Sequence, residues 1–71
     1  MTQRRMILTH LRRWGSITPM DALELYGVMR LAARISDLRY DGYHIDTEMV
    51  HALNRYGDKV KYAKYILTTS E

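Results

Sequence analysis

The feature that most constrains the fold is a change in hydrophobic periodicity at Gly42. Before this glycine, apolar residues recur every three or four positions, at Val28, Leu31, Ala32, Ile35 and Leu38. After it, neighbouring residues alternate in character, and one side of the alternation carries Tyr43, Ile45, Thr47 and Met49. The first spacing is typical of an amphipathic helix, and the second of a half-buried strand. We therefore expect an α+β fold that is mainly α.

The size of the chain limits it to one small domain, residues 1–71. A chain of 71 residues buries only about 60% of the surface that it exposes when unfolded, so its core must be compact. Cysteine is absent, and the histidines do not have the spacing of metal ligands. We therefore expect no disulfide, no metal and no cofactor.

Two helices are predicted before the segment that leads to Gly42, over residues 2–14 and 19–25. Gly15 can take the left-handed conformation that ends the first helix. The second helix has Thr18 as its N-cap, with a proline directly after the cap and an aspartate three residues after it. We expect this helix to bury Leu23, because the isoleucine before the cap can pack against it.

The segments on either side of Gly42 complete the pattern. A third helix is predicted over residues 29–40, and a short turn containing Gly27 joins it to the second, which is the outline of a helix-turn-helix. Two strands connected by the turn NRYGDK follow, over residues 43–67. The predicted order is three helices and then a two-stranded β-hairpin, that is, a winged helix-turn-helix.

The chain also resembles a known family in three stretches, GSITPMDAL, YGVMRLAARISDLRYDGYHIDT and NRYGDKVKYAKYIL. Over residues 3–67 it is similar to the small winged helix-turn-helix proteins that bacteriophages and prophages encode. The resemblance implies a compact DNA-binding domain, with the third helix in the major groove and the hairpin as a wing. It also implies that Arg30 and Arg34 lie in the recognition helix. At the wing tip it places Arg55, Tyr56, Gly57 and Lys59.

Basic residues are concentrated in three separate parts of the chain. Residues 1–15 hold four arginines and no acid, and residues 29–40 hold three arginines against one aspartate. Residues 54–64 hold four bases against one acid. Together with a formal net charge of +3, this distribution favours a polyanionic partner, and we expect that partner to be double-stranded DNA.

The outer face of the third helix is the predicted reading surface. Arginine can donate two hydrogen bonds to the O6 and N7 atoms of guanine, and a small residue such as Ala33 lets a helix lie deep in the groove. An aspartate three residues after Arg34 can orient its guanidinium. The predicted contacts of this helix are Met29, Arg30, Ala33, Arg34 and Asp37. The alternative is a solvent-exposed face held by an ion pair between Arg34 and Asp37.

Two further groups of residues are expected near the DNA. The hydroxyl groups of Ser16 and Thr18, at the start of the second helix, are predicted phosphate contacts. The wing is predicted to contact the minor groove or adjacent phosphates through Arg55, Tyr56, Lys59 and Lys61. Each group has an alternative, since wing lysines can serve only to keep an edge strand from pairing, and Thr18 can serve only as a helix cap.

The expected function is sequence-specific binding of double-stranded DNA, as a transcription regulator of a phage or prophage. Because one small domain rarely gives high specificity alone, we expect a homodimer or a partner protein. The location that follows is the cytoplasm of a bacterial host cell, in association with the nucleoid. The alternative function is a protein–protein interaction module, as an adaptor or a phage inhibitor of a host protein. Binding of structured RNA is a third alternative.

No catalytic arrangement is present in the sequence. It has no cysteine nucleophile, no glycine-rich phosphate loop and no HExxH motif. Asp46 and Glu48 share a strand face, where two carboxylates are ordinary solvated charges. The longest apolar runs are too short to cross a membrane. We therefore expect neither an enzyme with a small-molecule substrate nor a membrane protein.

Overall fold

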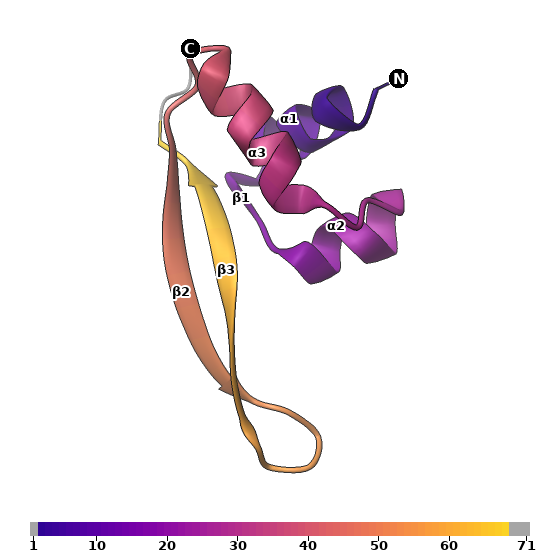
Figure 1. Ribbon diagram of the computed structural model, residues 1–71, viewed down its shortest axis with the longest axis vertical. Helices are drawn as coiled ribbons and strands as arrows, with labels where there is room; N and C mark the ends of the chain where they lie inside the picture. The colour runs from indigo at the N-terminus through magenta and orange to yellow at the C-terminus, as the bar shows by residue number, and fades with distance from the viewer. Residues whose placement is uncertain (1, 69–71) are drawn as a thin grey trace.

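Three helices are followed by a long β-hairpin in the computed structural model, which describes residues 2–68 (Figure 1). The hairpin extends well beyond the helices, and its tip lies at the lower end of the view. The start of α1 and the end of α3 lie at the opposite, upper end. The elements in chain order are α1 (Gln3–Trp14), β1 (Ser16–Ile17), α2 (Pro19–Tyr26), α3 (Leu31–Tyr40), β2 (Ile45–Leu53) and β3 (Lys59–Leu67).

The sheet has three antiparallel strands in the order β1-β3-β2. The sequence predicts only the two strands of the hairpin. This expectation is wrong, because the sheet contains β1 as a third strand. The additional strand pairs Ser16 with Ile66 and Ile17 with Tyr65. Two residues are too few to show a period of two, so periodicity cannot reveal this strand. By pairing with the end of β3, it ties the base of the hairpin to the helices.

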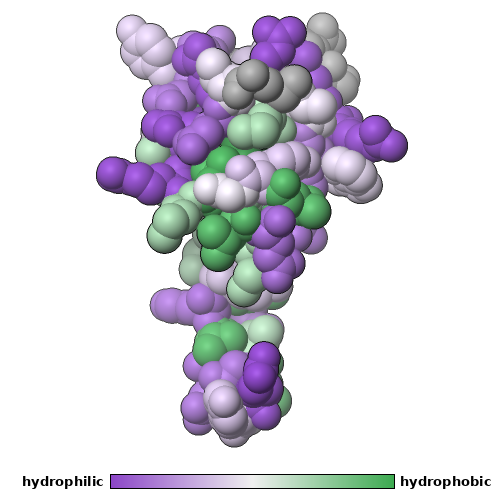
Figure 2. Space-filling view, turned by 90° about the vertical axis from the view of Figure 1, so that its right-hand side faces the viewer, coloured by the Kyte–Doolittle hydropathy of each residue, from purple (hydrophilic) through white to green (hydrophobic). Residues whose placement is uncertain are grey.

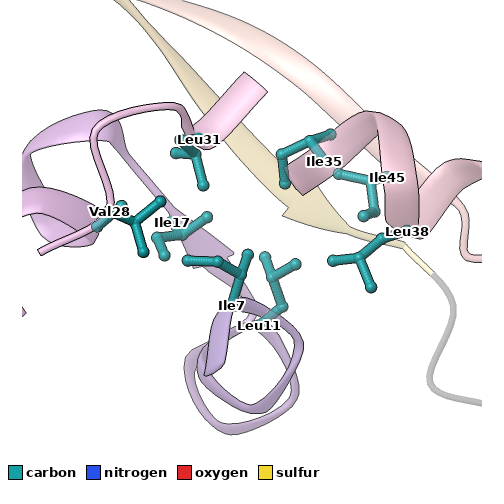
Figure 3. Packing of buried hydrophobic residues seen from close by; sticks show 9 residues of the cluster. Ile7, Leu11, Ile17, Val28, Leu31, Ile35, Leu38 and Ile45 are labelled. Carbon is teal, nitrogen blue, oxygen red and sulfur yellow. The ribbon is translucent and has the colours of Figure 1, made fainter. Parts of the chain in front are cut away.

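The core is a cluster of nine buried apolar residues at the junction of the three helices and the base of the hairpin (Figure 3). The side chains of Ile7 and Leu11 on α1 face those of Ile35 and Leu38 on α3. The cluster as a whole consists of Ile7, Leu11, Ile17, Ala22, Val28, Leu31, Ile35, Leu38 and Ile45. The hairpin contributes only its first residue to this cluster, so the core ends where the wing begins.

Local capping signals define the ends of the helices. The Oγ1 atom of Thr18 accepts a hydrogen bond from the Asp21 N–H at 3.1 Å, and the Asp21 carboxylate accepts one from the Thr18 N–H at 3.2 Å. This reciprocal pair is a capping box, and it confirms Thr18 as the N-cap of α2. At the end of α3, Gly42 has a φ of 104°, while the next N–H, that of Tyr43, bonds to the Leu38 carbonyl at 3.1 Å. This arrangement turns the chain from helix into strand.

Two details of the helices differ from the sequence predictions. The third helix begins at Leu31 rather than Met29, because Arg30 has φ −113° and ψ 61° and stands outside it. Only Leu31 and the residues four and seven positions later are buried on α3, so Ala32, which lies about 100° around the helix from Leu31, is exposed. Leu23 is 47% exposed and not a core residue, since the short α2 buries only its alanine completely.

Candidate nucleic-acid interface

The residues at the start of α3 are the most accessible of the predicted recognition residues. Met29 is 84% exposed, and Arg30 is also exposed at the N-cap position. The Arg30 side chain makes no capping hydrogen bond, and its guanidinium has no hydrogen-bond or ion-pair partner among the described residues. Both side chains therefore precede the first turn of α3 and do not lie along its outer face.

Arg34 is held by two partners on different helices. Its Nε donates to the Asp37 carboxylate at 3.0 Å, and its Nη1 donates to the Gln3 side-chain oxygen on α1 at 3.1 Å. Arg34 and Asp37 are both half-buried. The ion pair expected from their spacing is therefore present, and it fixes the guanidinium in one orientation. Since a guanidinium carries five N–H groups, three remain for another partner.

The side of α3 opposite the core carries a small side chain near its start and an aromatic side chain at its end, and both are uncharged. Because Leu31, Ile35 and Leu38 face the core, a step of about 100° per residue places Ala33 and Tyr40 on the opposite side. Tyr40 is 92% exposed, whereas Ala33 is half-buried. This face offers little bulk near its start and an aromatic ring at its end, which permits a close approach to a partner surface.

Arg39 connects α3 to the wing. Its Nε and Nη2 atoms donate to the Ile45 carbonyl at 3.0 and 2.6 Å, and Nη2 also donates to the Thr47 hydroxyl at 2.9 Å. The guanidinium lies 6.0 Å from the centre of the Tyr65 ring. Arg39 therefore satisfies a backbone carbonyl of the edge strand β2 and links the end of α3 to the base of the wing. Charge patterning does not reveal this role, because both partners lie beyond the turn that ends α3.

The far part of the wing has one basic face and one apolar face. Lys59 pairs across the hairpin with Leu53, and Lys61 pairs with His51, so these four side chains share one face. The other face carries two apolar cross-strand pairs, Val50 with Tyr62 and Ala52 with Val60. The sequence predicts the lysines as candidate contacts, and their common face follows from the strand register.

The turn of the wing presents the remaining predicted wing residues. Arg55 and Tyr56 are both exposed there. The Asn54 side-chain oxygen accepts hydrogen bonds from the N–H groups of Tyr56 at 2.9 Å and Asp58 at 3.0 Å. Gly57 has a φ of 82°, which favours glycine at this position. The asparagine therefore shapes the tip and holds the two exposed side chains beyond the ends of the strands.

An apolar hollow lies between the start of α2 and the wing. It has a volume of about 440 Å³ and is lined by Thr18, Pro19, Met20, Ala52, Leu53, Val60 and Tyr62. A second hollow of about 210 Å³ shares its proline and methionine and continues to Leu23, Val28 and Met29. On the face of the molecule shown in Figure 2, hydrophobic residues gather over the middle and again on the wing. The two together form one apolar hollow.

The two predicted phosphate contacts have different surroundings. Thr18 lines the apolar hollow, and its side-chain oxygen accepts from Asp21 within the capping box. Its hydroxyl proton has no acceptor among the residues described. Ser16 is half-buried in β1. Thr18 thus caps α2, which was the alternative to its predicted phosphate contact. Its hydroxyl proton is still available to a ligand.

The accessible predicted cations therefore lie in two parts of the molecule. Arg30 directly follows Met29, which lines the apolar hollow, while Lys59 and Lys61 share the wing face opposite the apolar cross-strand pairs. Sequence reasoning missed the apolar hollow, because its lining residues come from α2 and from strands more than 30 positions later. The hydrophobic period within one segment does not show which apolar residues of a distant segment lie beside it.

Some kinds of site are absent from the described part of the chain. Over residues 2–68, no three histidine, cysteine or acidic side chains are grouped closely enough to hold a metal ion. Within the same residues, no helix has the length and apolar character needed to span a membrane.

The family model described as a winged helix-turn-helix domain matches residues 2–70. A search of curated proteins found no match.

Proposed function

The chain belongs to the winged helix-turn-helix family, and we propose that it binds double-stranded DNA sequence-specifically, as a transcription regulator of a phage or prophage. The observation that carries the proposal is the placement of accessible cations just before α3 and on the wing. Arg30 lies at the start of α3, while Lys59 and Lys61 share one face of the wing. The regulatory role and the phage or prophage origin rest on the family resemblance.

In the proposed complex, the start of α3 enters the major groove. Arg30 donates two hydrogen bonds to a guanine, and Met29 makes an apolar contact with a thymine methyl group. Ala33 allows the close approach, because it adds no bulk to the outer face. Asp37 holds the Arg34 guanidinium, so this arginine reaches the DNA with its remaining N–H groups and without reorientation.

The wing contributes affinity more than base selection. Lys59 and Lys61 neutralise backbone phosphates, and Arg55 with Tyr56 at the tip reaches the adjacent minor groove. The free hydroxyl proton of Thr18 donates to a phosphate near the start of α2. A second copy or a partner protein then supplies a second half-site. The proposal includes no catalytic step and no cofactor, and it places the protein in the cytoplasm of a host cell, at the nucleoid.

Selection of bound sequences from a random DNA pool, followed by binding measurements across a salt series, tests this proposal. We expect Arg30→Ala to weaken binding to the selected site by about 1–3 kcal/mol and to relax the preference at one base. Lys61→Ala should weaken binding to all sequences and lower the salt slope by about one. Arg13→Ala on α1 removes the same charge and is the control. Absence of DNA binding at low salt contradicts the proposal.

A second candidate function is a protein–protein interaction module, favoured by the apolar hollow. Met20 is 59% exposed, and it lies in both parts of this hollow. Exposed apolar surface of this kind, with a polar rim, is typical of protein interfaces. Capture from a host lysate with and without nuclease separates the two functions. A partner retained after nuclease treatment, and lost with Met20→Ser but not with Lys61→Ala, favours the interaction module.

A further inference from the structure

A polar cleft lies at the end of the molecule opposite the wing tip. It has a volume of about 430 Å³ and opens between α1 and the connection from α3 to β2. Its lining consists of Thr2, Arg4, Arg5, Leu8, Thr9, Arg12, Leu38, Asp41 and Tyr43. Figure 1 shows the start of α1 and the end of α3 at the upper end, and Figure 2 shows this end as predominantly hydrophilic. The cleft is thus remote from the wing lysines.

Positive charge in this cleft exceeds negative charge by two, since three arginines face one aspartate. Arg4 approaches Asp41 at 3.4 Å, and both side chains of this pair are about half exposed. Arg12 donates to the Tyr43 hydroxyl at 3.2 Å, so its partner is neutral. The Arg5 guanidinium has no ion-pair or hydrogen-bond partner among residues 2–68. The excess charge is therefore carried by Arg5 and Arg12.

The position of Arg4 and Arg5 at the amino end of α1 is unfavourable without an anion. A helix carries partial positive charge at its amino end, where acidic residues are stabilising and basic residues are not. The first turn of α1 holds Arg4 and Arg5 and no acid. The first turn of α2, in contrast, holds Asp21. Local rules of this kind are most often broken at functional sites, and a bound anion would offset the repulsion in α1.

Two hydroxyl groups add donors to the cleft. The Thr2 Oγ1 atom accepts from the Arg5 N–H at 3.2 Å, and the Tyr43 hydroxyl accepts from Arg12. Each hydroxyl has one proton to donate, and neither proton has an acceptor among the described residues. Leu8 and Leu38 provide an apolar wall. Guanidinium groups and hydroxyl protons around one cleft form a donor set that suits an oxyanion with several acceptor atoms.

We propose that this cleft binds a phosphate group. The planar guanidinium of Arg5 can donate two parallel hydrogen bonds to phosphate oxygens, and Arg12 approaches from about two helical turns further along α1. The hydroxyl protons of Thr2 and Tyr43 occupy remaining acceptor sites. The phosphate belongs either to a small nucleotide-sized ligand or to the backbone of a nucleic acid. In both cases the site is separate from the proposed contacts of α3 and the wing.

NMR titration of the amide resonances tests the proposal at constant ionic strength. The probes are inorganic phosphate, adenosine monophosphate and a short DNA duplex, each added to separate samples. We expect saturable shifts at Arg5, Thr9 and Tyr43, and at least about tenfold weaker binding in the double variant Arg5→Gln/Arg12→Gln. The matched control Arg13→Gln removes a charge from the same helix outside the cleft. A second control, Lys59→Gln/Lys61→Gln, leaves the cleft intact but removes the wing charges.

The pattern of shifts distinguishes the outcomes. Saturation of the cleft by phosphate or the mononucleotide supports a small ligand, and saturation by the duplex alone supports a nucleic-acid backbone. Shifts spread over all basic residues, or shifts at the cleft that Arg5→Gln/Arg12→Gln leaves unchanged, overturn the proposal. If Lys59→Gln/Lys61→Gln no longer binds the duplex but keeps the phosphate shifts at the cleft, the loss assigns duplex binding to the wing. This result leaves the phosphate site of the cleft unaffected.

Discussion

The helical body and the far part of the wing are stabilised in different ways. The body, formed by the three helices, β1 and the base of the hairpin, contains all nine buried apolar residues. The distal wing, residues 49–62, contains none, and most of its side chains are exposed. Its strands are held by their pairing with each other and by their continuity with the base. Since an isolated hairpin is marginally stable at best, the body provides the support that the wing lacks.

Side chains in the two regions are therefore constrained by different neighbours. In the body, a side chain is constrained by its neighbours on several elements. In the distal wing, a side chain is constrained mainly by its cross-strand partner and by strand register. The exposed lysines and apolar residues of the wing are therefore free to serve a binding partner. Substitutions in the two regions should accordingly differ in their effect on the free energy of unfolding.

The largest expected effect is the loss of a core side chain in the body. Ile35→Ala should lower the free energy of unfolding by about 2–5 kcal/mol, because the removed atoms leave a cavity in the core cluster. Ile35→Val, which removes one methylene, should cost only about 0.5–1.5 kcal/mol. Urea denaturation followed by circular dichroism measures both. Val60→Ala in the distal wing is the comparison, and an equal loss there would contradict the distinction between the regions.

The next effect concerns the junction between the two regions. Arg39→Ala removes the donors to the Ile45 carbonyl and the Thr47 hydroxyl, and should cost about 1.5 kcal/mol. Hydrogen exchange should accelerate at the base of the hairpin more than in α1. Arg39→Lys keeps the charge but loses the planar fork, so it should restore only part of the stability. Full restoration by lysine would show that charge alone matters at this position.

A smaller effect is expected at the cap of α2. Thr18→Ala should lower the free energy of unfolding by about 1 kcal/mol, because the Asp21 N–H loses its acceptor. Thr18→Ser retains the hydroxyl and should remain close to the parent protein. Thermal denaturation of the two variants gives the comparison. A serine variant as unstable as the alanine variant would assign the effect to packing of the threonine methyl group in the apolar hollow.

The smallest effect on stability is expected for the wing lysines. Lys61→Ala should change the free energy of unfolding by less than about 0.5 kcal/mol, because it alters only exposed surface. Chemical denaturation provides this value, with the parent protein measured in the same buffer. A loss above 1 kcal/mol would mean that the distal wing has packing of its own.

Local signals account for most of the fold that the sequence predicts. Thr18 is the N-cap of α2 as expected, in a capping box with Asp21, and Gly15 and Gly27 take the left-handed conformation at the ends of α1 and α2. These features depend on residues a few positions apart, so a single segment contains the information. Burial is predicted less well, as Leu23 and Ala32 show, because it depends on which neighbouring elements cover a helix.

The sequence by itself determined the three helices, the hairpin and their order, since capping residues, glycines and hydrophobic period act within a few residues. Only the tertiary structure decided which distant residues the arginines contact. Gln3 meets Arg34, and Arg12 meets Tyr43, across 31 positions of the chain. The two-residue strand β1, the apolar hollow and the polar cleft likewise arise between distant segments. Their geometry depends on how the helices and the wing pack around one small core, and no local pattern encodes that packing.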